Sequence, residues 1–215
     1  MATVAPAVWQ LETSLSTGGN VAYARSMGVI PEDSALMLRY KDGDVAAFEL
    51  LYRRHNDSLY RYLLRLSLNR DVAEDVFQDA WGKIIKARHR YRPTAKFTSY
   101  LYRVAHNCFI DYVRKNKRHM VVSAIDPDCS PNPGDEPDLQ VEKTLARQRL
   151  DVALRTIPDE QRDAFLLHEE AGLSIDTIAE VTGVNRETVK SRLRYATKKL
   201  KAALAEPAVQ NQRTA

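Results

Sequence analysis

The stretch LSIDTIAEVTGVNRETVKSRLRYATKKLK, residues 173–201, contains a turn between two helices that decides the architecture of this part of the chain. Ser174 is a favourable N-cap for a short first helix, and Gly183 is suited to the turn that ends it. Ala179, Gly183 and Val189 are spaced four and then six residues apart. A small residue permits close helix approach, and a branched residue fills the space beneath the second helix. The pattern therefore predicts a helix-turn-helix.

The second helix of this motif is strongly basic. Residues 184–201 carry seven Lys and Arg residues and one acidic residue. Four of the cations recur at four-residue steps and share one helical face, namely Arg186, Lys190, Arg194 and Lys198. A basic run alone is most often a solvated helix face. After a helix-turn-helix it instead predicts a helix that enters a DNA groove lined by phosphates.

Composition excludes several classes of protein. The chain has 215 residues, 44% of them apolar, with a net charge of +4 and a pI near 9.0. The two cysteines, Cys108 and Cys129, lack metal-ligand spacing, which favours a reducing cytoplasm over a disulfide-bonded secreted protein. No basic residue precedes Arg25 and no apolar run is long enough for a signal or a membrane span. We therefore expect a soluble cytoplasmic protein.

The chain divides by composition into helical and non-helical parts. Residues 120–142 contain four prolines, six acidic residues and no Lys or Arg, which is typical of a linker. We predict a flexible N-terminal arm (1–30), a first helical domain (31–119), an acidic proline-rich linker (120–140), a second helical domain (141–205) and a C-terminal tail (206–215). The predicted fold is all-α, with two small domains on a flexible linker that move independently in the free protein.

Three helices are expected in the first domain. Asp44 is a candidate cap for the first, and Asp71 with Glu74 resembles a capping box at the start of the second. Pro93 interrupts the chain before the third, which spans 97–118.

The third helix interleaves aromatic and basic residues. The rings are Tyr100, Tyr102, Phe109 and Tyr112, and the cations are Arg114, Lys115, Lys117 and Arg118. This combination suits single-stranded DNA, because rings stack on bases while cations follow the backbone. Most of these rings are expected in the core, with one or two facing solvent.

No pattern of an enzyme is found. The sequence HEEAG at His168 lacks the second histidine of a zinc-protease motif, and no glycine-rich phosphate loop occurs. The histidines are scattered without ligand spacing. We therefore predict a non-enzyme without catalytic residues, metal or cofactor.

Three segments together resemble the extracytoplasmic-function (ECF) sigma factors of the sigma-70 family. They are AEDVFQDAW (73–81), FTSYLYRVAHNCFIDYVRKNKR (97–118) and the segment from IPDEQRDAFLL to the basic helix (157–201). The resemblance covers about residues 33–204. It implies a protein that binds core RNA polymerase, directs it to promoters and melts the DNA, under control of an anti-sigma factor or a stress signal.

The resemblance also implies roles for individual residues. The polymerase-binding residues would be Asp75, Gln78 and Asp79. Those for the −10 element and melting would be Tyr100, Arg103, Asn107, Asp111, Arg114, Lys115 and Arg118, with Asn107 lining a pocket for an extruded base. Those for the −35 element, within the helix-turn-helix at 174–194, would be Arg186, Glu187, Lys190, Ser191 and Arg194, with Tyr195 directly after it.

Two other interpretations remain open. One is a classical helix-turn-helix regulator in which residues 33–119 form a sensor or dimerisation domain. The other is an adaptor that bridges proteins through its helices. Binding to core RNA polymerase separates the sigma factor from the regulator, and loss of nucleic-acid binding on charge reversal of Arg186 and Lys190 excludes the adaptor.

Overall fold

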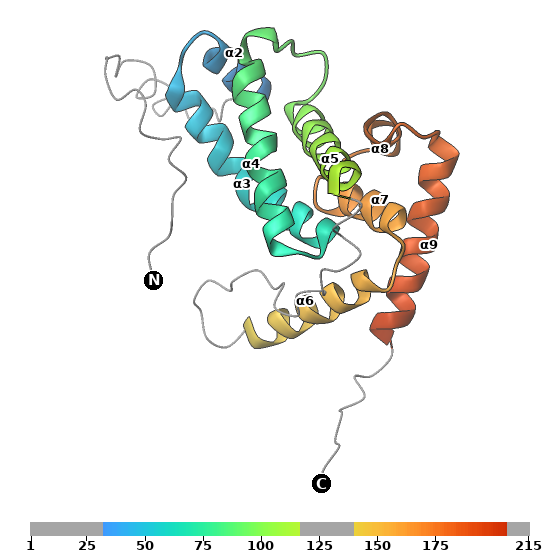
Figure 1. Ribbon diagram of the computed structural model, residues 1–215. Coiled ribbons are helices and arrows are strands. Elements are labelled where there is room, and N and C mark those ends of the chain that lie inside the picture. Colours follow the sequence, from blue (N-terminus) through green and yellow to red (C-terminus); the bar gives the residue numbers. More distant parts are fainter. Residues whose placement is uncertain (1–31, 117–139, 206–215) are drawn as a thin grey trace.

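The computed structural model describes residues 32–116 and 140–205, and within these ranges every regular element is helical. The elements are α2 (Asp33–Lys41), α3 (Val45–Ser67), α4 (Arg70–Ala87), the short 3₁₀ turn η2 (Arg88–Arg90), α5 (Phe97–Asn116), α6 (Gln140–Arg155), α7 (Asp159–Glu169), α8 (Ile175–Thr182) and α9 (Arg186–Ala205). The all-α prediction is confirmed (Figure 1). The predicted arm, linker and tail lie outside the described residues.

Local sequence signals set the ends of the long helices in the first bundle. The Asp44 carboxylate accepts a hydrogen bond from the Ala47 amide at 3.2 Å, so the predicted cap of α3 is confirmed. The predicted capping box at Asp71 is wrong, because α4 begins earlier. There the Asn69 side chain accepts from the Val72 amide at 3.0 Å. Asn69 is itself a favoured N-cap residue and stands two positions ahead of Asp71.

An aromatic cluster fills the core of this bundle between α3 and α4. The rings of Phe48 and Trp81 meet edge to face with centroids 5.7 Å apart, and Tyr52 lies 5.1 Å from Trp81. Nearer the C-terminal end of α3, the fully buried Tyr62 contacts Tyr102 of α5, with ring centroids 5.3 Å apart. These large buried rings fix the orientation of α4 and α5, the two helices that carry the candidate site of this domain.

The helix-turn-helix of the second bundle forms as predicted. The Ser174 hydroxyl accepts from the Thr177 amide at 3.2 Å, and α8 ends at Gly183, whose φ is +70°. Val189 is completely buried beneath the turn, and Ala179 is half-buried. A Cβ atom disfavours a left-handed φ, so this turn favours glycine at position 183. The turn itself sets the angle between α8 and α9.

The two bundles pack against each other in the structure, and the expectation that they move independently in the free protein stays a prediction. Helix α7 packs on α3, and α8 packs on α5 (Figure 1). The partners include buried polar groups on both sides, such as Tyr62 and Asp163, whose side chains hydrogen-bond at 2.8 Å. Residues this far apart in the sequence carry no periodic signal of their pairing, so composition alone suggested separate domains.

None of the helices in the described part of the chain combines the length and apolarity needed to cross a bilayer.

Gly183 and Gly82 offer a matched test of the helix-turn-helix geometry. Neither glycine has an atom within 4 Å of an added Cβ, and only Gly183 has a positive φ. Gly183→Ala should lower the free energy of unfolding by about 1 kcal/mol through backbone strain. Gly82→Ala, inside α4, should raise it by about 0.5–1 kcal/mol through helix propensity. Urea denaturation followed by circular dichroism measures both, and equal effects of the two changes would contradict the assigned turn.

Candidate polymerase and nucleic-acid interfaces

One face of α4 presents a polar patch to solvent. Asp75, Gln78 and Asp79 are all exposed, and their spacing puts them on one side of the helix. The opposite side is buried in the bundle through Val76, Ala80 and Ile84. Helix α4 thus has one face in the core and one face in solvent, and the patch lies on the solvent face.

Lys83 connects this patch to α5. Its ammonium lies 3.1 Å from the Asp79 carboxylate and 3.7 Å from that of Asp111. Partial burial works to raise the pKa of Asp79, but hydrogen bonds from Lys83 and Cys108 and the charge of Lys83 hold it below its ordinary value. Asp79 is thus an anion in the free protein. Its partner Lys83 also lies near Asp111 on α5, the helix predicted to bind the −10 element.

The outer face of α5 carries the residues predicted for the −10 element. Exposed side chains occur at four-residue steps and then side by side near the helix end, namely Arg103, Asn107, Asp111, Arg114 and Lys115. The Asn107 amide is exposed and offers both a donor and an acceptor to a base edge. Arg118 lies outside the described residues.

The aromatic residues of α5 are less accessible than expected. Tyr102 is 1% exposed and belongs to the core. Tyr100, Phe109 and Tyr112 are half-buried and pack against that core. Tyr100 lies 5.3 Å from the ring of Tyr91, and burial raises the pKa of the Tyr100 phenol. Three of the rings are therefore partly exposed, and none of the four is fully exposed.

The cations in the N-terminal part of α9 are exposed to solvent, and each forms an ion pair with a neighbouring carboxylate. The Arg186 guanidinium donates to both oxygens of Asp176, at 2.8 and 3.0 Å, and the Lys190 ammonium donates to Glu187 at 2.7 Å. Hydrogen bonding to Lys190 lowers the pKa of Glu187. The pairs orient the two cations on the exposed side of α9.

Farther along α9 the side chains interact with one another. The Arg194 guanidinium lies 5.2 Å from the centroid of the exposed Tyr195 ring, a cation–π contact. The Ser191 hydroxyl donates to backbone carbonyl groups of Glu187 and Thr188, so it is engaged with its own helix. The structure thus places five of the six predicted −35 residues outward, and Ser191 is half-buried.

Sequence reasoning missed the residues that pair with the predicted site. Lys83 stands four residues after Asp79, a spacing that signals the pair. Asp176 stands ten residues before Arg186, and their contact depends on the sharp turn at Gly183. Among the described residues no group of His, Cys, Asp and Glu has an arrangement suited to a metal ion.

Comparison with known proteins places both helical bundles in one class, the sigma-70 factors. The model for sigma-70 region 2 matches residues 51–119, and that for sigma-70 region 4 matches residues 147–200. The ECF RNA polymerase sigma factor SigE of Mycolicibacterium smegmatis is 32% identical over 76% of this chain and 65% of its own length. The sigma factor CarQ of Myxococcus xanthus is 31% identical over 79% of this chain and 96% of its own length.

A solved structure has the same fold. The sigma factor RpoE of Bartonella quintana, crystallised with the anti-sigma factor NepR, superposes with a TM-score of 0.61 at 24% identity over 73% of this chain and 96% of that one. The chain belongs to the ECF group of the sigma-70 family.

Cys108 provides a test of the local electrostatics beside Asn107. Burial raises the pKa of the Cys108 thiol to about 11, although the ammonium of Lys83 acts in the opposite direction. The thiol is therefore protonated at pH 8 and should react with iodoacetamide much more slowly than in the unfolded chain. Peptide mapping after brief alkylation at pH 8 measures this. Equal labelling of Cys108 in native and urea-unfolded protein would contradict the buried position.

Proposed function

We propose that α4, α5 and α9 divide the work of a sigma factor among three surfaces. The polar patch on α4 binds core RNA polymerase, the outer face of α5 holds the melted −10 strand, and the N-terminal part of α9 reads the −35 element in the major groove. The observation that carries this proposal is the occurrence of two separate exposed basic surfaces of different chemistry on one chain, with an exposed acidic patch beside one of them.

The chemistry of each surface fits its proposed target. A recognition helix presents its first turns to base edges, and Arg186 and Lys190 occupy those turns on α9. An exposed amide such as that of Asn107 suits hydrogen bonding to a base taken out of the stack. The half-buried rings of α5 suit stacking on bases where they are exposed, while Arg114 and Lys115 follow the phosphates.

In this proposal the protein acts in the cytoplasm and catalyses no reaction itself, because RNA polymerase synthesises the transcript. Its activity would be controlled by an anti-sigma factor. Support comes from the solved relatives, of which one is a complex of CnrH with the cytosolic domain of CnrY and another a complex of RpoE with the anti-sigma factor NepR.

Charge reversal of the α4 patch tests the polymerase contact. Asp75→Lys with Asp79→Lys should abolish binding to core polymerase, because both carboxylates are exposed and would present the wrong charge to the partner. Helicity should be unchanged. The matched control is Glu49→Lys with Asp57→Lys, which reverses two exposed acids on α3. Retention of core enzyme in a pull-down by the α4 variant would disprove the assignment of this patch.

Two lysines of α9 separate base reading from phosphate binding. Lys190→Ala should weaken binding to the preferred −35 element by about 1–3 kcal/mol. It should also reduce the difference in affinity between this element and a scrambled one. Lys198→Ala, two turns farther along the same exposed face, should weaken binding to both elements equally and reduce the salt slope by about one unit. Holoenzyme affinity on the two templates across a salt series gives both quantities. Identical behaviour of the two variants would show that the reading face is misplaced.

A further inference from the structure

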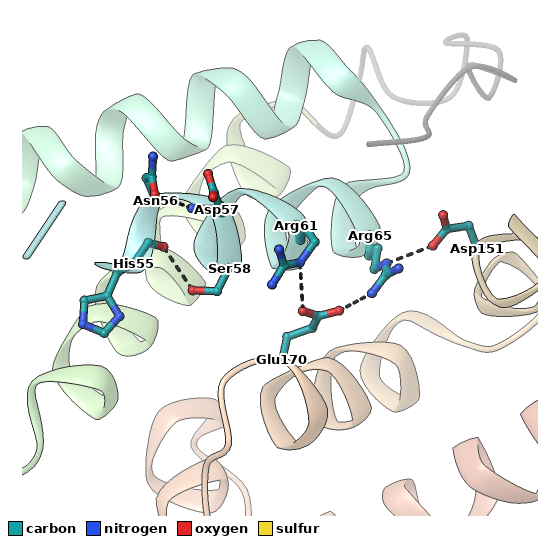
Figure 2. Close-up of polar contacts among 8 residues, drawn as sticks. All are labelled: His55, Asn56, Asp57, Ser58, Arg61, Arg65, Asp151 and Glu170. Atoms are coloured by element: carbon teal, nitrogen blue, oxygen red, sulfur yellow. Dashed lines mark hydrogen bonds and ion pairs between the residues drawn. The ribbon is translucent and has the colours of Figure 1, made fainter. Parts of the chain in front are cut away.

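Arg194 on α9 is held by an aromatic ring, whereas several other arginines of the chain are held by carboxylates. Arg61 and Arg65 of α3, for example, both donate to the Glu170 carboxylate (Figure 2). By contrast, the guanidinium carbon of Arg194 lies over the ring of Tyr195, 5.2 Å from its centroid. In the described part of the chain, no carboxylate lies within ion-pair distance of Arg194.

Packing in the core does not account for the position of the Tyr195 ring. Tyr195 is 50% exposed, although other residues of α9, such as Val189 and Leu200, are buried. Arg88 likewise lies over a ring, that of Tyr40 at 5.6 Å, but Tyr40 is 6% exposed and belongs to the core of the first bundle. A single exposed ring is ordinary on a protein surface. What distinguishes Tyr195 is its contact with a cation on the face predicted to read DNA.

A ring holds a cation in a way that leaves the cation available to DNA. The ring face attracts the charge as a whole, so most of the N–H donors of the guanidinium remain free. A carboxylate partner instead occupies donors, as Asp176 does at Arg186 through hydrogen bonds of 2.8 and 3.0 Å. Arg194 can therefore bind a base edge without giving up its contact with Tyr195.

Arg194 also lies where α9 still reaches base edges. It shares the exposed face of α9 with Arg186 and Lys190, and it follows Arg186 by eight residues. At a rise of about 1.5 Å per residue, this separation is about 12 Å along the helix. The same length of B-form DNA holds about three to four base pairs at about 3.4 Å each. Arg186 and Arg194 would therefore meet bases near opposite ends of one element, and guanine is the base that arginine binds through two hydrogen bonds, to N7 and O6.

We propose that Tyr195 is a positioning residue, which holds the Arg194 guanidinium by a cation–π contact for bidentate hydrogen bonding to a guanine of the −35 element. The inference rests on the proposed function for the assignment of α9 to that element. Tyr195 itself needs no contact with a base. It restricts the rotamers of the long arginine side chain before binding, which lowers the entropy that Arg194 loses on binding.

Leucine and phenylalanine at position 195 form a matched pair, because only leucine removes the ring. Tyr195→Leu should lower the affinity of the holoenzyme for the preferred −35 element about two- to fivefold. Tyr195→Phe should retain the affinity that Tyr195→Leu loses. The salt slope should stay the same in both variants, because no phosphate contact is lost. Leu204→Ala, which changes an exposed apolar residue farther along α9, is the control and should bind as wild type.

A double-mutant cycle shows whether Tyr195 acts through Arg194. Arg194→Ala should weaken binding to the preferred element about tenfold. In the Arg194→Ala background, Tyr195→Leu should have no further effect. The base is located by replacing each guanine of the element in turn with 7-deazaguanine, which lacks the N7 acceptor. One of these replacements should weaken binding by wild type and leave binding by Arg194→Ala unchanged.

Every outcome of these measurements decides the inference. Equal losses in Tyr195→Phe and Tyr195→Leu would assign the effect to the hydroxyl group and overturn it. Additive losses in the double variant, or a loss from Tyr195→Leu that is the same on the preferred and the scrambled element, would also contradict it. If the wild-type holoenzyme binds both elements equally, the proposed function fails and the inference fails with it. If wild type discriminates and Tyr195→Leu does so equally well, only the inference fails.

Discussion

The buried guanidinium of Arg162 is the interaction on which the arrangement of the second bundle depends. Arg162 is 5% exposed, and an unpaired charge at such a position would be strongly destabilising. It pairs with the carboxylate of Asp159 at 2.7 Å and donates to carbonyl oxygens at the end of α6, which joins α6 to α7. It also donates to the carbonyl oxygen of Leu66 at 3.0 Å, at the end of α3 in the other bundle. One side chain therefore links three helices.

The partners of Arg162 and Asp163 lie differently with respect to the contact between the bundles. Arg162 has partners within its own bundle and one outside it, so separation of the bundles leaves its charge paired. Asp163 accepts a hydrogen bond from Tyr62 and lies 3.1 Å from Nδ1 of His106, and both of these residues belong to the first bundle. The neighbouring residues Arg162 and Asp163 thus have different roles in packing. Arg162 mainly joins elements of its own bundle, and Asp163 joins that bundle to the other one.

A common electrostatic principle governs the DNA-facing cations. Arg186, Lys190 and Arg103 are each paired with a nearby carboxylate, and all three pairs are exposed. Exposed pairs contribute little to stability, typically about 0–1 kcal/mol, so exchanging a carboxylate for a phosphate or a base costs little. The ion pairs also restrict the conformations of these cations, which reduces the conformational entropy lost on binding. Carboxylates close to the reading face are therefore compatible with DNA binding.

The sequence predicted those features that depend on local pattern. The caps at Asp44 and Ser174 and the turn at Gly183 are short-range signals, and all were read correctly. The separate helix α2 was missed, because only three helices were expected in the first domain. The cap of α4 was misplaced because Asn69 and Asp71 are both good capping residues two positions apart. The packing of the bundles was missed because it depends on pairs such as Arg65 with Glu170, which lie far apart in the chain. The roles of the site residues came from resemblance to the family and remain predictions.

Transcription from a genomic DNA library by core polymerase, with and without the full chain, tests the central claim most directly. If the chain is a promoter-selecting sigma factor, mapping of transcript 5′ ends should reveal new starts that appear only with the chain. Those starts should share a two-part upstream sequence with a fixed spacing between its halves. The same set of starts with and without the chain, or new starts that share no upstream sequence, would contradict the account.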